Sequence, residues 1–307
     1  MLAVMMLAVA LLPGWAVAHR DSSACTGAAA LPNHCRAADS GRYVPDAAHA
    51  ETDHDGDGTA ENCWASGDFE HFNTCTFGRP HAKYTVALVG NSHAAQWLMP
   101  LRRWADQYDL RVVTYLIPKC FAIDEKVDIG DKQRGPVMND RCYAWGQWVQ
   151  RETNQLKPDL IVTTERTYKK PIHPLPGGTY ASWKAGYAGY LKGWTDQGRH
   201  VLVVRDNPVP GKQVPPCLAA HPNKLSKCAG ERSVWLKPDA LVAAARSLNN
   251  PLVRVVDLSE HMCTDTTCPA VIGGLCVYRD HSHMTATWIG SLATYLEEPF
   301  SEALHHH

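Results

Sequence analysis

The chain has 307 residues, of which 45% are hydrophobic and 20% charged, a composition typical of a folded globular protein. This length accommodates one large core domain, with room for an appended segment. The 30 Lys and Arg residues nearly balance the 31 Asp and Glu residues. Because there is no basic stripe and no Lys/Arg run interleaved with aromatic residues, the sequence argues against a nucleic-acid partner.

The first eighteen residues, 1–18, are apolar and predict export. They end in Ala16-Val17-Ala18, which is typical of a signal-peptidase site, although no Lys or Arg precedes the apolar run. The alternative is the outer end of a transmembrane helix that belongs to a longer membrane protein. Both interpretations place the rest of the chain outside the cytoplasm, as a secreted or membrane-associated protein.

Eleven cysteines are present, and most of them occur in close pairs. No CxxC…CxxC spacing typical of a zinc site is found, so disulfides in an oxidising compartment are favoured. The predicted pairs are Cys25/Cys35, Cys63/Cys75, Cys217/Cys228, Cys263/Cys268 and, as a plausible fifth, Cys120/Cys142. The odd count leaves one thiol over, and we predict that Cys276 is free.

Residues 19–83 show no sustained periodicity and predict an irregular extension stapled by disulfides. The run Asp53-His54-Asp55-Gly56-Asp57-Gly58 resembles the start of a Ca²⁺ loop, with Glu61 as a further oxygen ligand. Trp64 stands where the bidentate Glu of such a loop belongs. A solvated acidic turn is therefore the favoured interpretation.

From Tyr84 onward, strand and helix patterns alternate. Strands are expected at 85–89, 110–117, 159–164, 200–205 and 252–258, and helices at 93–108, 140–156, 180–197, 238–248 and 285–296. This alternation predicts a mostly parallel α/β sheet of about five strands with helices on both faces. We expect residues 84–299 to form the catalytic domain and residues 300–307 to be a tail that ends in part of a His tag.

Two short segments suggest a catalytic site. Ser92 follows the first strand, and Asp280 and His283 precede the last helix. Reactive residues of parallel sheets gather at the carboxyl ends of the strands, so these segments are expected to meet. Serine needs a neighbouring imidazole to accept its proton, and a carboxylate to fix that imidazole. We predict Ser92 as nucleophile, His283 as base and Asp280 as its partner.

Two alternatives to this site are open at this stage. His281 competes with His283 as the base, although the spacing from Asp280 favours His283. Ser92 is also a good candidate for an ordinary helix N-cap, because serine is favoured at that position. A Ser-His-Asp set requires no metal, and no His/Cys cluster indicates one, so no cofactor is expected.

The sequence resembles a known family. Gly90-Asn91-Ser92-His93 with the following Ala94-Ala95-Gln96-Trp97 is similar to the first block of SGNH hydrolases, and Asp280-His281-Ser282-His283 is similar to their last block. Further stretches are similar to one branch, the extracytoplasmic SGNH domains attached to acyltransferase-3-type membrane acyltransferases. These stretches are 25–31, Cys63-Trp64, 75–78 and 277–280. The resemblance covers most of the chain from Cys25 to Trp288.

The resemblance implies a three-layer α/β/α, flavodoxin-like fold and O-acyl chemistry on cell-envelope glycans. It implies an acyl donor delivered by a membrane acyltransferase domain or protein, with Ser92, His283 and Asp280 as the triad. The family's Asp in the first block is Asn91 here, and its oxyanion-hole Gly and Asn are not evident. The Ser92 N–H is expected to supply one oxyanion donor, and Asn91, Thr164 and Arg166 are candidates for oxyanion or substrate contacts.

The leading functional hypothesis is O-acyl transfer, most simply O-acetyl transfer, to a glycan hydroxyl through an acyl-serine. A secreted carbohydrate esterase would use the same residues with water as acceptor. A catalytically degenerate glycan-binding module is the third hypothesis, and it rests on the missing oxyanion residues alone.

Overall fold

The computed structural model describes residues 22–36, 38–166 and 168–305. The predicted signal or transmembrane segment at 1–18 and the final His306 and His307 lie outside these described residues. Within them, no helix combines the length and the apolar character needed to cross a membrane.

A six-stranded sheet forms the centre of the molecule, in the order β1-β3-β2-β5-β7-β9. Its strands are β1 (Thr76–Gly78), β2 (Tyr84–Gly90), β3 (Leu110–Leu116), β5 (Leu160–Thr164), β7 (Val201–Val204) and β9 (Val253–Val256). The last five are parallel, and β1 pairs antiparallel with β3 at the edge. The parallel strands therefore follow the flavodoxin-like order, which confirms the predicted fold class.

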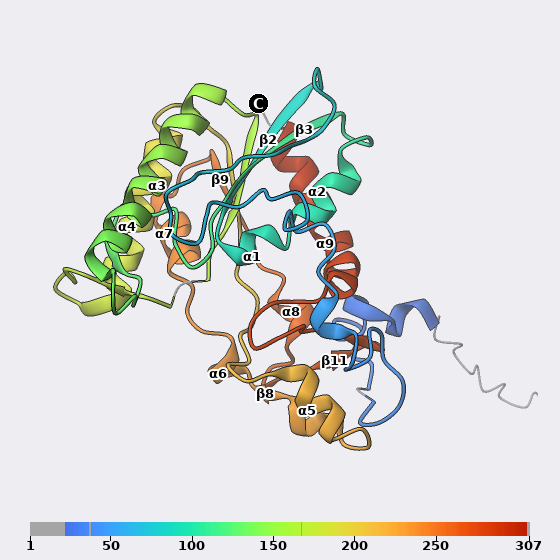
Figure 1. Ribbon diagram of the computed structural model, residues 1–307. Coiled ribbons are helices and arrows are strands. Elements are labelled where there is room, and N and C mark those ends of the chain that lie inside the picture. Colours follow the sequence, from blue (N-terminus) through green and yellow to red (C-terminus); the bar gives the residue numbers. More distant parts are fainter. Residues whose placement is uncertain (1–21, 37, 167, 306–307) are drawn as a thin grey trace, which may run out of the picture.

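Helices cover both faces of this sheet (Figure 1). One face carries α3 (Gly135–Leu156), α4 (Gly178–Thr195) and α7 (Ala240–Leu248), and the other carries α1 (Ser92–Ala95), α2 (Leu98–Trp104) and α9 (Ala286–His305). Alternation along β2 supplies both cores, since Val86 and Leu88 join the α2/α9 side while Ala87 and Val89 join the α3/α4 side. With both faces buried, the central strands are almost entirely apolar, as parallel sheets require.

Shorter elements complete the fold. They are the 3₁₀ turns Ser22–Cys25, Gly27–Ala29, Ala50–Thr52 and Leu225–Cys228, the helices α5 (Val214–Ala220), α6 (Arg232–Trp235) and α8 (Ser259–Met262), and the strand pairs β4 (Val127–Asp128) with β6 (Lys170–Pro171), β8 (Gly230–Glu231) with β10 (Thr267–Cys268), and β11 (Val271–Ile272) with β12 (Leu275–Cys276). The N-terminal extension docks on the β11–β12 hairpin, where Gly27 N–H donates to the Gly273 carbonyl and Cys276 N–H to that of Val44.

The helix expected at 93–108 is instead two helices, α1 and α2. A continuous helix would place Pro100 opposite the Gln96 carbonyl, but proline has no N–H to donate to it. The Gln96 side chain is engaged outside the helix, where it accepts the Met284 N–H at 2.6 Å. The break therefore follows from one proline and one tertiary contact.

Two other helices differ from their expected bounds. The helix expected from residue 140 begins at Gly135, with Pro136 in its first turn, where proline is well tolerated. The last helix continues past 296 to His305, despite Pro299 within it, because Phe300 and Leu304 are fully buried against the core. It thus runs through the residues that we expected to form a tail.

The five predicted disulfides are all confirmed. They join Cys25 to Cys35, Cys63 to Cys75, Cys120 to Cys142, Cys217 to Cys228 and Cys263 to Cys268. Cys276 is free and buried, as predicted. Such extensive crosslinking indicates a protein that folds in an oxidising compartment.

Gly90 at the end of β2 allows the sharp turn that presents Ser92. Its φ of 141° lies in the region that favours glycine, and a Cβ there would come 2.6 Å from the Thr164 carbonyl oxygen. We expect Gly90→Ala to lower the free energy of unfolding by about 1–3 kcal/mol beyond the cost of its unfavourable φ, because the added Cβ would clash with the Thr164 carbonyl. The matched control is Gly198→Ala, which has φ of 71° and open space around the added Cβ. Equal losses in urea unfolding would contradict this steric explanation.

Candidate active site

Ser92 is the first residue of α1, directly after β2. The N-cap of that helix is Asn91, whose side-chain oxygen accepts the His93 N–H at 3.0 Å. Ser92 is therefore not the N-cap, and the structural alternative for this serine is wrong. Its side chain is partly exposed, at the carboxyl edge of the parallel sheet. This is where an α/β enzyme exposes its reactive groups.

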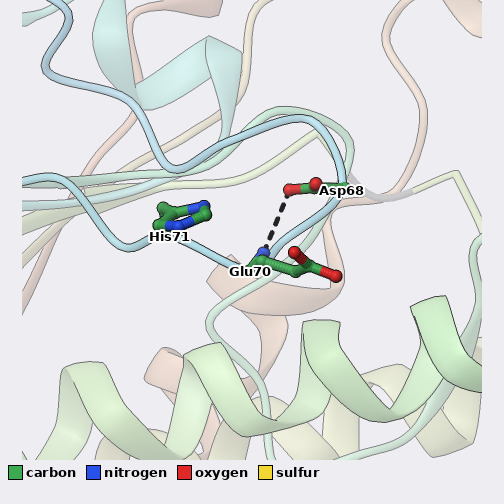
Figure 2. A group of neighbouring side chains, drawn as sticks. All are labelled: Asp68, Glu70 and His71. Atoms are coloured by element: carbon green, nitrogen blue, oxygen red, sulfur yellow. Dashed lines mark hydrogen bonds between the residues drawn. The ribbon is translucent and has the colours of Figure 1, made fainter.

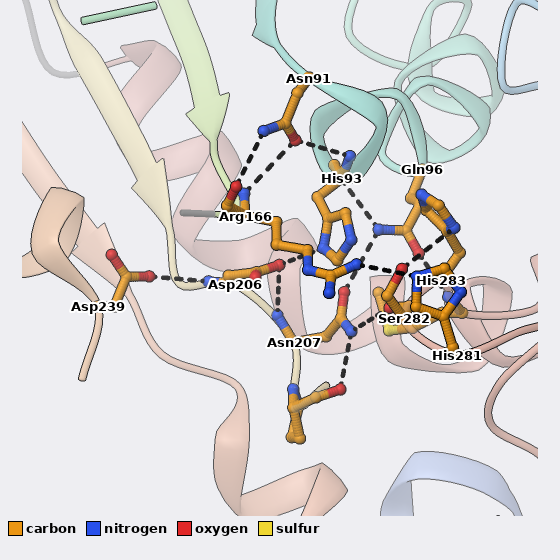
Figure 3. Close-up of polar contacts among 12 residues, drawn as sticks. Asn91, His93, Gln96, Arg166, Asp206, Asn207, Asp239, His281, Ser282 and His283 are labelled. Carbon is orange, nitrogen blue, oxygen red and sulfur yellow. Dashed lines mark hydrogen bonds and ion pairs between the residues drawn. The ribbon is translucent and has the colours of Figure 1, made fainter. Parts of the chain in front are cut away.

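Asp280 and His283 form a tight pair in the loop before α9. His283 Nδ1 lies 2.6 Å from Asp280 Oδ2, while Asp280 Oδ1 accepts the N–H groups of Ser282 and His283. These backbone bonds shape the loop, so the Asp-x-x-His spacing itself orients the imidazole. His281 instead points to Arg166, whose Nη1 lies 3.4 Å from His281 Nε2 (Figure 3).

Burial and pairing set the charges of this pair. Burial alone would raise the pKa of Asp280, but hydrogen bonds and charge from His283 outweigh it and hold that pKa well below its usual range. Burial lowers the pKa of His283, and this outweighs the raising effect of Asp280. His283 is therefore neutral at pH 7, and its Nδ1–H donates to the carboxylate. The Nε2 atom is left as a proton acceptor.

The loop at 280–283 lies against the first turn of α1. The rings of His93 and His283 have centroids 4.9 Å apart, and Met284 N–H donates to Gln96. No hydrogen bond joins Ser92 to His283 in the described part of the chain, where His283 Nε2 is buried without a partner. The direct contact expected of a triad is thus absent, as is common before substrate binds.

The three candidates for oxyanion or substrate contacts have different surroundings. The Asn91 side chain is hydrogen-bonded to the backbone of Arg166, two residues after the end of β5. It accepts the Arg166 N–H and donates to the Arg166 carbonyl. Thr164 is 1% exposed, and its hydroxyl is buried without a partner. The Arg166 guanidinium reaches across the site to His281 (Figure 3). Of these three side chains, only that of Arg166 is partly exposed.

Sequence reasoning missed a second His–Asp pair. His93 Nδ1 lies 2.5 Å from Asp206 Oδ1, and His93 is 1% exposed. In the sequence, His93 only follows Ser92 and Asp206 only follows a strand pattern, so neither carries a catalytic signal of its own. The available signal was topological, because both residues follow strands, β2 and β7, whose carboxyl ends lie on the same edge of the sheet.

Asp206 is itself held from both sides. Its N–H donates to Asp239 Oδ2 at 3.1 Å, and its Oδ1 also accepts the Asn207 N–H. The Asn207 side chain donates to the Ser282 carbonyl and accepts from Gln96. These bonds tie the end of β7 to α1 and to the Asp280–His283 loop, so the two His–Asp pairs share one rigid frame.

Glu165 follows β5 next to this frame, and no ion pair to it is found among the described residues. It is 1% exposed, and its Oε1 accepts the Ala122 N–H at 2.9 Å. Burial raises the pKa of Glu165 well above its usual range. A Cβ on Gly90 would lie 3.3 Å from this Oε1. Glu165 therefore packs against the turn at Gly90 and holds the backbone at Ala122 by a hydrogen bond.

A cavity of about 330 Å³ opens beside the second pair. Its lining includes Asp206, Asn207, Arg166, Tyr168 and Trp235. Most of the remaining lining is apolar. This space accommodates a ligand next to Asp206, the partner of His93.

Two other polar loops carry no metal assignment. In the Ca²⁺-like loop, Asp53 caps α9 by accepting the N–H groups of residues 286 and 287, and Asp57 is buried instead of solvated. Figure 2 shows Asp68, Glu70 and His71, whose ligand atoms cluster on the surface. Asp68 accepts N–H and O–H groups of its own loop, and Glu70 pairs with Arg141. In both loops, hydrogen bonds and an ion pair within the protein account for the positions of these acidic side chains, so we assign no metal to either loop.

Comparison with known proteins gives one family. The model of the SGNH domain (fused to AT3 domains) matches residues 58–297. The periplasmic domain of the lipopolysaccharide acetyltransferase from Salmonella ser. Paratyphi A is 12% identical, with a TM-score of 0.55 over 85% of this chain and 100% of that domain. A Bacteroides fragilis NCTC 9343 protein, proposed to be an acylhydrolase, is 11% identical over 75% of this chain and 91% of its own, with a TM-score of 0.43, and we base no argument on it. No curated protein sequence matches.

Proposed function

Because the chain belongs to the family of SGNH domains fused to AT3 domains, we propose that it transfers an acyl group, most simply acetyl, to a hydroxyl of a cell-envelope glycan. The observation that carries this proposal is the partly buried His283, fixed by Asp280 at 2.6 Å, beside the helix that begins with Ser92; within the described residues its Nε2 has no partner. This arrangement supplies a base for a serine nucleophile.

The proposed reaction has two halves. Ser92 Oγ attacks the carbonyl carbon of the donor while its proton passes to His283 Nε2, which then protonates the leaving group. A glycan hydroxyl next attacks the acyl-serine, and its proton returns through His283 to Ser92 Oγ. The Ser92 N–H at the start of α1 is the proposed first oxyanion donor.

The partners follow from the family. The family is described as SGNH domains fused to AT3 domains, so we propose that a membrane acyltransferase domain or protein delivers the acyl group and tethers this domain outside the cytoplasm. Five disulfides support that compartment. The glycan acceptor is proposed from the similar Salmonella domain, which belongs to a lipopolysaccharide acetyltransferase.

The test follows both halves of the reaction with p-nitrophenyl acetate as donor. We expect a burst of p-nitrophenol, a Ser92 peptide heavier by one acetyl group in mass spectrometry, and acetyl transfer to chito-oligosaccharides that competes with hydrolysis. Release of acetate alone, at every acceptor concentration, would identify an esterase. A chain that never becomes acetylated would support the degenerate binding module.

A further inference from the structure

The His93–Asp206 pair duplicates the Asp280–His283 pair within one site. In each pair the Nδ1 atom lies within 2.6 Å of a carboxylate oxygen, and in each the buried Nε2 atom has no hydrogen-bond partner among the residues that the structure describes. Figure 3 shows the two imidazoles next to each other, with the Asp206–Asn207 segment below His93. When the Nδ1–H of a neutral imidazole donates to a carboxylate, its Nε2 is an acceptor.

The proposed acyl transfer uses His283 Nε2 and leaves His93 Nε2 without a role. A serine nucleophile needs a single imidazole, which takes and returns the proton in both halves. A buried polar atom left without a partner costs free energy, so a purely structural histidine is expected to use both nitrogens. His93 uses only Nδ1, and its ring lies 4.9 Å, centroid to centroid, from that of His283, the proposed base.

Resting on the proposed function, we propose that the acceptor carries two adjacent hydroxyl groups, and that His93 Nε2 accepts a hydrogen bond from the one that does not react. The reacting hydroxyl bonds to the acyl carbon, the Ser92 Oγ–carbon bond breaks, and the proton passes through His283 Nε2 to Ser92 Oγ. His93 takes part in no bond change. The chemical class of the acceptor is thus a vicinal diol, as in a sugar ring.

The separation of the rings suits two adjacent oxygens. Ring centroids 4.9 Å apart can be bridged by neighbouring hydroxyls that each donate over about 2.8 Å, whereas a single hydroxyl can donate to only one nitrogen. The cavity lined by Asp206 and Asn207 has room for the rest of a sugar ring. The partly exposed Arg166 side chain crosses the site (Figure 3), and we expect it to move when the acceptor binds.

The test compares acceptors on one acetyl-enzyme. The full chain is acetylated with p-nitrophenyl acetate, and the ratio of transfer to hydrolysis is measured with cis- and trans-cyclohexane-1,2-diol and with cyclohexanol. We expect at least one diol to be favoured over cyclohexanol by about tenfold or more, because the lone alcohol leaves His93 Nε2 unpaired. Equal transfer to all three would overturn the inference without any variant, and a wild type that forms no acetyl-enzyme would refute the proposed function itself.

Two substitutions separate recognition from support. In His93→Asn the amide nitrogen replaces Nδ1 and keeps the bond to Asp206, but the Nε2 acceptor is lost. We expect transfer to the diol to fall about tenfold more than the p-nitrophenol burst or transfer to cyclohexanol, so that the preference for the diol is lost. His93→Gln places an amide oxygen near the Nε2 position and should restore part of that preference. If transfer to the diol and transfer to cyclohexanol fell by the same factor in His93→Asn, His93 would have only a structural role, and the inference would be overturned.

Discussion

Ser92→Ala is expected to form no acetyl-enzyme and to lose acyl transfer and hydrolysis by about 10⁴–10⁶-fold, the loss seen when a serine nucleophile is removed from a triad. The fold should remain, because Asn91 and not Ser92 caps α1. We therefore expect the free energy of unfolding to change by less than about 0.5 kcal/mol. The measurements are the p-nitrophenol burst and urea unfolding on the same preparation.

Ser282→Ala is the matched control for this substitution. The Ser282 hydroxyl lies 3.4 Å from His283 Nδ1, so this serine also lies beside the proposed base. It faces the nitrogen that Asp280 holds, and not the free Nε2. We expect the acylation rate of Ser282→Ala to stay within a few-fold of wild type, although Ser282 is fully buried. An inactive Ser282→Ala beside an active Ser92→Ala would mean that the nucleophile is misassigned.

The sheet was predictable because its signals are local. Buried parallel strands are continuous apolar runs, and the five runs of this chain became β2, β3, β5, β7 and β9. The edge strand β1 was not foreseen within residues 19–83, since three residues carry no periodicity and their pairing with β3 is set by the tertiary fold. The helix break between α1 and α2 similarly depends on what Gln96 meets across the site.

The site divides in the same way. Asp280 and His283 are three residues apart, so the loop that joins them also brings them together, and spacing was sufficient to predict their hydrogen bond. His93 and Asp206 are 113 residues apart. Their pairing depends on β5 lying between β2 and β7, and on the turn that follows each strand. The sequence indicates that both residues lie at strand ends, but it does not show how the turns after β2 and β7 are placed relative to each other.

The surroundings of Glu165 could not be predicted either. An acidic residue after a strand normally indicates a solvated loop or a charged ligand contact, whereas here the side chain is enclosed next to Gly90. Its raised pKa follows mainly from burial, which the sequence does not report. The second oxyanion donor, for which Thr164 and Arg166 are candidates, also depends on how side chains are oriented in the fold, and its assignment stays a prediction.

Asp280→Asn is expected to lower the acylation rate by about 10²–10⁴-fold while preserving the loop. The amide oxygen can still accept the N–H groups of Ser282 and His283, but the amide nitrogen donates to His283 Nδ1 and shifts the ring proton to Nε2. The tautomer that accepts the Ser92 proton is then disfavoured, as in serine hydrolases whose buried Asp is replaced. His281→Asn, the control for the alternative base, should stay within a few-fold of wild type.

The pH profile distinguishes this mechanism from simple damage. Protonated His283 cannot act as a base, so activity is lost as pH falls through its pKa, and because burial lowers that pKa, the wild-type midpoint should lie below 6.5. Asp280 raises the pKa of His283, which means that Asp280→Asn should move the acidic limb to still lower pH. If Asp280→Asn lost rate while the acidic limb of its pH profile stayed in place, the Asp280 carboxylate would have no effect on the pKa of His283. That result would contradict the proposed catalytic role of the pair.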